Sequence, residues 1–179
     1  MKIKDICFIG IFTSLIILLA QLSIPTPFGV PITIQTTIIM LSGIILGSKK
    51  GAIATANYII LGSIGLPVFA GFSGGIGHIM GPTGGFILSF PIMAFLAGLG
   101  FFGIIIGIIF NFISGMLWFA FVTQNSIDMA FYIAVLPFIP MALLDMIVLT
   151  IIRHKICTKG VASWESKLQA QEWQYQKNI

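Results

Sequence analysis

The sequence has 179 residues, of which 58% are hydrophobic and 8% are charged, and its mean hydropathy is +1.09. This composition excludes a water-soluble globular protein and is typical of an integral membrane protein with one membrane domain. The formal net charge of +4 comes from basic residues at the ends of apolar runs, so it predicts orientation in a lipid bilayer and no nucleic-acid partner.

Six apolar runs predict six membrane-crossing helices, at residues 6–24, 34–47, 52–66, 86–99, 104–122 and 131–152. The first run lacks a small-x-small cleavage site and is longer than the apolar core of a signal peptide, so we expect a retained helix. With a cytoplasmic N-terminus, six crossings place every Lys and Arg on the cytoplasmic side. The predicted fold is an all-α integral membrane bundle with both termini inside.

Residues 1–156 form the predicted membrane domain, and residues 157–179 form a polar, amphipathic cytoplasmic tail. In the tail, Trp164, Leu168 and Trp173 share one helical face, a pattern that fits either an interfacial helix or a disordered segment. Cys7 and Cys157 lie at predicted cytoplasmic ends, where thiols stay reduced, so we expect no disulfide.

Within the first run, Gly10 and Ser14 form a small-xxx-small pair, a spacing that lets another helix approach closely in lipid. Either a partner protein or a neighbouring helix of the same bundle satisfies this pattern. The loop that follows contains Pro25, Pro27 and Pro31, and it predicts either a lid over a cavity or a rigid connector.

Several polar residues follow that loop in the second and third runs. Gln35, which lies beside Thr33, Thr36 and Thr37, is the one that we expect to face a ligand. In the third run, the buried amide of Asn57 and the neighbouring Tyr58 need hydrogen-bond partners, which another helix or a solute can provide.

The glycine-rich stretch 62–85, GSIGLPVFAGFSGGIGHIMGPTGG, lies between the third and fourth runs. Its glycines, together with Pro67 and Pro82, exclude a continuous helix. Non-helical backbone at membrane depth is tolerated only where protein buries it or water reaches it. We therefore expect this stretch to form the wall or lid of a solute site.

Residues 71–74 of that stretch read GFSG, a pattern that also surrounds the nucleophile of intramembrane serine proteases. Such chemistry needs a histidine within hydrogen-bond reach of Ser73. His154 lies at the opposite predicted membrane face, and His78 is five residues away in the same loop. We expect His78 to face lipid headgroups or water, so proteolysis remains a minor alternative.

Asp145 lies eight residues before Arg153, which is about 12 Å along a helix from the cytoplasmic end. A carboxylate at that depth is a functional candidate by default. Pro137 and Pro140 predict that its helix is discontinuous, with N-terminal amides near residues 141–143 that offer partial positive charge. The alternative is a simple proline kink with Asp145 bonded to a neighbouring helix.

Together these segments resemble the BioY family, the biotin-specific substrate-binding (S) components of energy-coupling factor (ECF) transporters. The resemblance rests on VPITIQ at 30–35, the Leu46–Gly47 pair before a basic turn, YIILGSIGLPVFAG at 58–71, GPTGGF at 81–86 and LPFIP at 136–140. It implies an S-component-like six-helix bundle with a glycine-rich outer loop. The implied location is the bacterial plasma (inner) membrane, and the implied activity is capture of biotin from outside, without enzymatic activity, cofactor or metal.

The resemblance also implies partners, namely a transmembrane coupling subunit, which docks at Gly10 and Ser14, and two ATPase subunits. The sequence contains no GxxxxGK[ST] phosphate-binding loop, so ATP hydrolysis is expected from those other chains.

One departure from the family concerns the residues after the LPFIP turn. Where the family commonly has an acidic residue and, three positions later, a lysine, this chain has Ala142 and Asp145. A biotin carboxylate would then bind backbone amides, or Asp145 would accept ureido N–H groups; otherwise the ligand is a different small solute or the affinity is low. The candidate substrate-binding residues are Gln35, Asn57, Tyr58, Phe69, Phe72, Ser73, Gly74, Gly75, Thr83 and Asp145.

Overall fold

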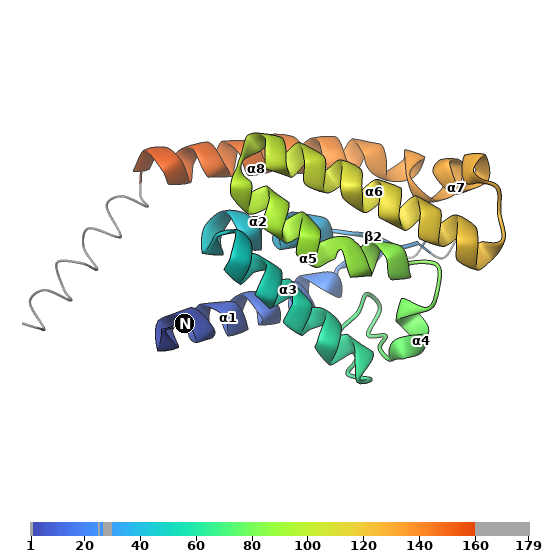
Figure 1. The fold of residues 1–179 in the computed structure, drawn as a ribbon, viewed down its shortest axis with the longest axis horizontal. Coiled ribbons are helices and arrows are strands. Elements are labelled where there is room, and N and C mark those ends of the chain that lie inside the picture. The colour runs from blue at the N-terminus through green and yellow to red at the C-terminus, as the bar shows by residue number, and fades with distance from the viewer. Residues whose placement is uncertain (1, 25, 27–29, 160–179) are drawn as a thin grey trace, which may run out of the picture.

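The computed structural model describes residues 2–24, 26 and 30–159, which form a helical bundle with one short strand pair (Figure 1). The helices are α1 (Ile3–Ala20), α2 (Gln35–Leu46), α3 (Ser48–Ser63), α4 (Ile76–Ile79), α5 (Gly84–Leu99), α6 (Phe101–Thr123), α7 (Ile127–Ala134) and α8 (Ile139–Lys159), with the 3-10 turn η1 (Leu136–Phe138) before α8. Strands β1 (Ser23–Ile24) and β2 (Ile32–Thr33) are antiparallel, with Ser23 opposite Thr33.

The predicted all-α architecture is confirmed, and each apolar run contains a helix. The first run ends earlier than predicted, because residues 23–24 pair with β2 and leave the helix. The sixth run is divided into α7, η1 and α8, so the predicted discontinuity at Pro137 and Pro140 is also confirmed. Three segments, Ile3–Ala20, Phe101–Thr123 and Ile127–Lys155, are long and apolar enough to cross a membrane by length and composition.

Helix α5 lies at the centre of the packing, in contact with α2, α3 and α6, while α1 packs on α2 and α3 and α8 packs on α2 and α6. The close approach of α2 to α5 requires glycine, since a Cβ atom at Gly43 would lie 1.9 Å from the Ala94 carbonyl oxygen. The fully buried side chains between these helices include Ile39, Met40 and Met93. This core holds the helices that surround the cavity described below.

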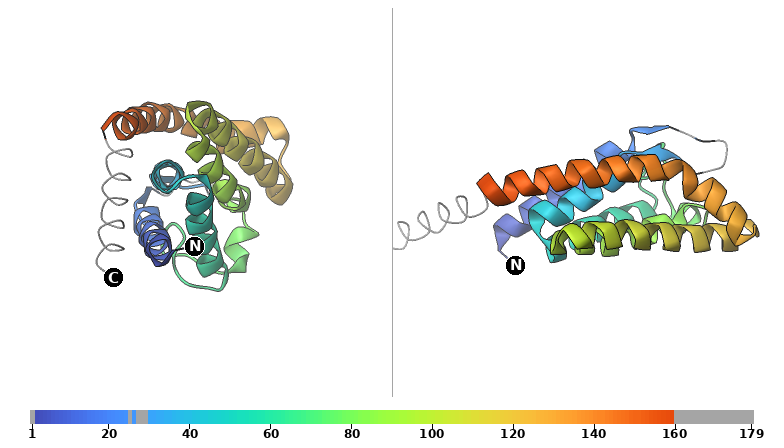
Figure 2. Two further views of the ribbon diagram at one scale, coloured as in Figure 1. Left: turned by 60° about the vertical axis from the view of Figure 1, so that its left-hand side comes forward. Right: turned by 90° about the horizontal axis from the view of Figure 1, so that it is seen from above.

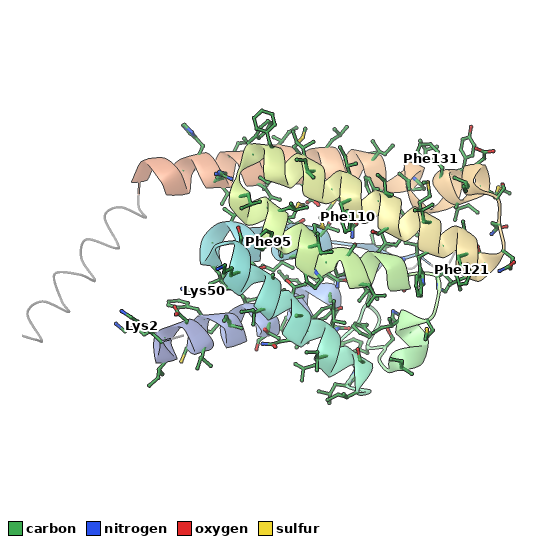
Figure 3. All side chains as sticks on the ribbon, in the orientation of Figure 1. Lys2, Lys50, Phe95, Phe110, Phe121 and Phe131 are labelled. Carbon is green, nitrogen blue, oxygen red and sulfur yellow. The ribbon has the colours of Figure 1, made fainter. Side chains whose placement is uncertain are left out.

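The helix ends and the turns between helices form two groups, one at each end of the bundle. The start of α1, the α2–α3 turn, the α5–α6 turn and the end of α8 lie at one end, and α4 and α7 lie toward the other (Figures 1 and 2). At the first end, Lys50 Nζ lies 2.6 Å from Asp5 Oδ1 and joins α3 to α1. The basic residues labelled in Figure 3, Lys2 and Lys50, both lie at this end.

The outer surface of the bundle is apolar along much of its length. Large hydrophobic side chains are exposed on several helices, for example Ile60 on α3, Phe102 and Phe121 on α6 and Ile147 on α8. Figure 3 shows the side chains around the helices, and the exposed Phe95, Phe121 and Phe131 are among those labelled. A soluble protein rarely exposes apolar surface on this scale, whereas a membrane protein presents it to lipid.

Candidate functional site

A partly enclosed cavity lies among α2, α3, α5, α6, α8 and the glycine-rich stretch. Its volume is about 90 Å³, several times the roughly 10–15 Å³ that one water molecule needs. Its apolar lining residues are Val30, Pro31, Met40, Ala70, Phe86, Ile87, Phe90, Met93, Ile108, Phe112, Phe138, Met141 and Ala142. Its polar lining residues are Thr33, Gln35, Thr36, Tyr58, His78, Thr83, Asn111 and Asp145. Mostly apolar walls with a few converging polar groups are typical of a small-molecule site.

Asp145 reaches the cavity from the second turn of α8 and is 4% exposed. Its Oδ2 accepts a hydrogen bond from Thr36 Oγ1 at 2.8 Å, and its Oδ1 accepts one from Thr37 Oγ1. Both threonines belong to the first turn of α2. Asp145 therefore both bonds to a neighbouring helix and lines the cavity, so the structural and the functional interpretation of this residue are compatible.

Gln35 and Tyr58 form a second polar pair on the cavity wall. Gln35 Nε2 donates to the Tyr58 hydroxyl at 2.8 Å, and both side chains are buried. The amide at the start of α2 and the phenol in the middle of α3 thus hold each other in place. A buried polar pair of this kind stays satisfied without a ligand and still presents polar atoms to one.

The aromatic ring of Phe69 supports this wall from behind. It packs over Gly62, where an added Cβ atom would lie 2.1 Å from Phe69 Cζ. It meets Tyr58 edge-on at a centroid distance of 5.4 Å and stacks on His78 at 5.2 Å. Gly62 is needed here because any side chain would displace the ring on which both cavity residues rest.

His78, which we expected to face headgroups or water, faces the partly enclosed cavity. Its ring is half-buried, lines the cavity and lies 3.5 Å from Thr83 Oγ1 through Nε2. Burial lowers the pKa of His78 below its ordinary value, so the ring is neutral at pH 7. The cause of the inward orientation is the stacking contact with Phe69, which lies nine residues earlier and which local sequence does not reveal.

The other sequence-predicted residues lie away from the cavity lining. Asn57 is half-buried on α3, and Phe72 is 72% exposed with a positive φ of 56°. Ser73 Oγ donates to the Ala70 carbonyl at 2.8 Å. Gly74 packs against the Leu66 carbonyl, and Gly75 precedes α4 with a φ of 92°. Asn57 therefore belongs to α3, and the other four residues belong to the glycine-rich loop beside the cavity.

The arrangement needed for a serine nucleophile is not formed. The Ser73 hydroxyl is bonded to a backbone carbonyl within its own turn. The His78 ring is instead directed toward Phe69 and Thr83. Because a catalytic serine needs a base within hydrogen-bond reach, the geometry of this pair does not support proteolysis.

Sequence reasoning missed Asn111, which reaches the cavity from the middle of α6 and is 2% exposed. Its Nδ2 donates to the Phe86 carbonyl at 3.1 Å and to Ser89 Oγ at 2.6 Å. The sequence signal for this residue is its isolation, because Asn111 is an amide within the long apolar segment of α6 and a buried amide needs hydrogen-bond partners in a membrane.

Comparison with known proteins identifies the fold and the family. The model of the BioY family matches residues 1–160. The chain belongs to the BioY family. The probable biotin transporter BioY of Pyrococcus horikoshii is 43% identical over 145 residues, which cover 78% of this chain and 87% of that protein. The biotin transporter BioY of Thermotoga maritima is 49% identical over 90 residues, covering 50% of this chain and 53% of that protein.

A solved structure extends this BioY relationship to the whole bundle. The crystal structure of an S-component for biotin from an ECF-type ABC transporter matches with a TM-score of 0.78 and 31% identity. The match covers 88% of this chain and 93% of that chain. The resemblance drawn from the sequence is therefore confirmed, and so is the S-component-like architecture.

Proposed function

We propose that this chain binds biotin as the S component of an energy-coupling factor importer and is a binding subunit, not an enzyme. The observation that carries the proposal is the cavity in a BioY-family membrane bundle, with buried polar groups set in apolar walls. The names of the relatives and of the solved structure give the solute class. Solute binding requires no catalytic serine, and the Ser73 hydroxyl donates its hydrogen bond to the Ala70 carbonyl.

The proposed membrane arrangement has six crossings, formed by α1, α2, α3, α5, α6 and the α7–η1–α8 segment, with both termini in the cytoplasm. It is supported by the basic residues, since those of α1, the α2–α3 turn and the end of α8 gather at one end of the bundle. We place the chain in a bacterial plasma membrane with the glycine-rich stretch facing outward. The proposed cytoplasmic tail, residues 157–179, lies mostly outside the described residues, and α8 continues to Lys159.

Four of the candidate residues are proposed to contact the solute directly, namely Gln35, Tyr58, Thr83 and Asp145. Each lines the cavity. His78 and Asn111, which line the same cavity, complete the polar set. Phe69 is proposed to support this set through its contacts with Tyr58 and His78.

The proposed partners are a transmembrane coupling subunit, docked on α1, and two ATPase subunits. Gly10 and Ser14 are both exposed, and a Cβ atom at Gly10 would meet no atom within 4 Å. The Ser14 hydroxyl donates to the Gly10 carbonyl at 3.0 Å, so this small-residue face needs no polar partner. Its exposure supports docking of another protein over packing within the bundle.

Solute-binding calorimetry on the detergent-purified protein tests the function. We expect saturable binding of biotin or a biotin derivative at micromolar concentration or below. The Tyr58→Phe variant should bind more weakly because Gln35 loses its acceptor. The matched change Ile60→Ala, at an exposed position of α3, should leave affinity unchanged. Absence of binding for every biotin compound at micromolar concentration would contradict the proposal.

A pull-down tests the docking face. The double variant Gly10→Leu/Ser14→Leu should retain solute binding and lose recovery of the coupling subunit, because the bulky side chains keep the helices apart. Ile11→Phe enlarges a neighbouring exposed side chain of α1 and should leave recovery unchanged. Equal recovery of the coupling subunit with the wild type, the double variant and Ile11→Phe would assign docking to another surface.

A further inference from the structure

The cavity has an unusual balance of charge. Asp145 is the acidic residue in its lining, and among the residues that the structure describes no lysine or arginine lines it. The other titratable lining groups are Tyr58 and His78. A phenol is neutral at pH 7, and burial lowers the pKa of His78 and keeps the ring neutral there. No positive charge of these side chains therefore faces the cavity.

Asp145 keeps unused acceptor capacity toward the cavity. Each of its oxygens accepts a single hydroxyl, from Thr36 or Thr37. A carboxylate has about four acceptor positions, so the two threonines satisfy only part of it. One helical turn earlier, Ala142 contributes a methyl group to the same wall and cannot compensate the charge. The Asp145 end of the cavity is thus built to meet hydrogen-bond donors.

Asn111 reinforces this acceptor character from the opposite helix. Its amide nitrogen has two hydrogens, and the Phe86 carbonyl and Ser89 Oγ accept both. The atom of Asn111 that remains for a ligand is the carbonyl oxygen Oδ1, an acceptor. Two deeply buried polar side chains, one from α6 and one from α8, therefore both offer acceptors.

Free biotin suits such a site poorly. It ends in an alkyl carboxylic acid, whose ordinary pKa is near the value of about 4.3 for a glutamate side chain, so it is an anion at pH 7. In this cavity the anion would meet no cationic side chain, and its acceptor oxygens would face the acceptor oxygens of Asp145 and Asn111. Conversion of that carboxyl group to an amide removes the charge and adds an N–H donor.

We propose that this site preferentially takes biotin whose side-chain carboxyl group is amidated, as in biotin amide or ε-N-biotinyl-lysine, and discriminates against the free biotin anion. The inference rests on the proposed biotin-binding function and specifies the form of the ligand. Asp145 is the specificity-determining residue. The bicyclic ring system is common to both ligand forms, so the charge of the tail decides between them.

Calorimetry with free biotin, biotin amide and ε-N-biotinyl-lysine, on the same detergent-purified full chain at pH 7, tests the proposal. We expect the two amides to bind at least about tenfold more tightly than free biotin. Equal affinities, or tighter binding of free biotin, would overturn this proposal and leave the biotin-binding function standing. Failure of all three compounds to bind would overturn both.

The Asp145→Asn variant identifies the cause of the preference. It keeps the size of the side chain and replaces one acceptor oxygen by an N–H donor, so the ratio of affinities between biotin amide and free biotin should fall by about tenfold. The matched variant Asp5→Asn removes a carboxylate at the far end of the bundle and should leave the ratio unchanged. An unaltered ratio in Asp145→Asn would show that Asp145 does not set the selectivity.

Discussion

Asp5 and Asp145, two carboxylates in different regions of the molecule, are compensated in different ways. Asp5 lies at the end of the bundle, where its side chain is 24% exposed and pairs with Lys50 at 2.6 Å. Asp145 is 4% exposed and accepts hydrogen bonds from the hydroxyls of Thr36 and Thr37. At the bundle end the carboxylate pairs with an opposite charge, whereas in the cavity the carboxyl group of Asp145 accepts hydrogen bonds from neutral hydroxyls. The acceptor positions of Asp145 that the threonines leave unused therefore remain available to a ligand.

The largest effect is expected from Asp145→Ala. Loss of a charged, buried hydrogen-bond acceptor costs about 1.5–3 kcal/mol, which corresponds to roughly tenfold to a hundredfold weaker binding of biotin amide. Thr36 and Thr37 also lose their acceptor, so the melting temperature should fall as well. Calorimetry and thermal unfolding measure the two effects. Asp5→Ala serves as the control, and an equal loss of affinity in both variants would remove the distinction between the two regions.

The next-largest effect is expected on thermal stability when Gly62 and Gly10 are each replaced by alanine. Gly62→Ala places a methyl group 2.1 Å from the Phe69 ring, and overpacking of this kind costs about 1–3 kcal/mol. Gly10→Ala adds a methyl group in open space and should stabilise α1 by up to about 1 kcal/mol through helix propensity. Thermal unfolding in detergent should therefore shift in opposite directions. A shift of the same sign for both would mean that the Phe69 ring is not confined by Gly62.

These contrasts also show what the sequence predicts well. The helices follow from apolar runs, and the break before α8 follows from Pro137 and Pro140, because proline lacks the N–H that a continuous helix needs. The depth of Asp145 follows from helical rise alone. Each of these features is determined by local backbone chemistry; the structure agrees with the helices and the break, and it buries Asp145 within the bundle.

The orientation of single side chains was harder to predict. In a membrane helix both the lipid face and the core face are apolar, so periodicity does not say which way Asn111 points. In irregular backbone there is no period at all, and the direction of His78 depends on a stacking contact with Phe69. The sequence predicts Phe72 and Ser73 as site residues of the glycine-rich stretch, but Phe72 is exposed and the Ser73 hydroxyl donates to the Ala70 carbonyl within its own turn.

An intermediate effect on local stability is expected at Gln21, where the end of α1 meets the glycine-rich stretch. Its amide donates to the Ile17 and Val68 carbonyls and accepts from the Phe72 N–H at 2.8 Å, so it ties α1 to the glycine-rich stretch. Gln21→Ala should cost about 1–2 kcal/mol locally through the lost hydrogen bonds. Hydrogen exchange of amides 66–75 should accelerate, while exchange in α5 stays slow. Asn125→Ala, at an exposed turn, is the control and should leave residues 66–75 unchanged.

A smaller effect is expected from pH through His78, which lies outside the membrane-crossing helices. Burial lowers the pKa of His78, so between the folded and unfolded pKa values the unfolded chain binds more protons. Its contribution to stability is therefore complete above the unfolded pKa of about 6.5 and is lost as the pH falls through the folded pKa. The difference in melting temperature between wild type and His78→Gln should shrink from about pH 7.5 to about pH 5.5. A constant difference would mean that His78 does not titrate differently in the folded state.

The smallest effect is expected at the Asp5–Lys50 pair, because both partners are partly exposed to solvent and pairs of this kind contribute little to stability. A double-mutant cycle with Asp5→Asn and Lys50→Met should give a small favourable coupling at low salt. In about 1 M salt, where the Debye length is about 3 Å, that coupling should disappear. The affinity loss in Asp145→Ala should persist under the same conditions, because a buried carboxylate is screened much less. Equal salt sensitivity of the two would mean that water and ions reach Asp145 as freely as they reach Asp5, and the selectivity proposed for the cavity would then lose its electrostatic basis.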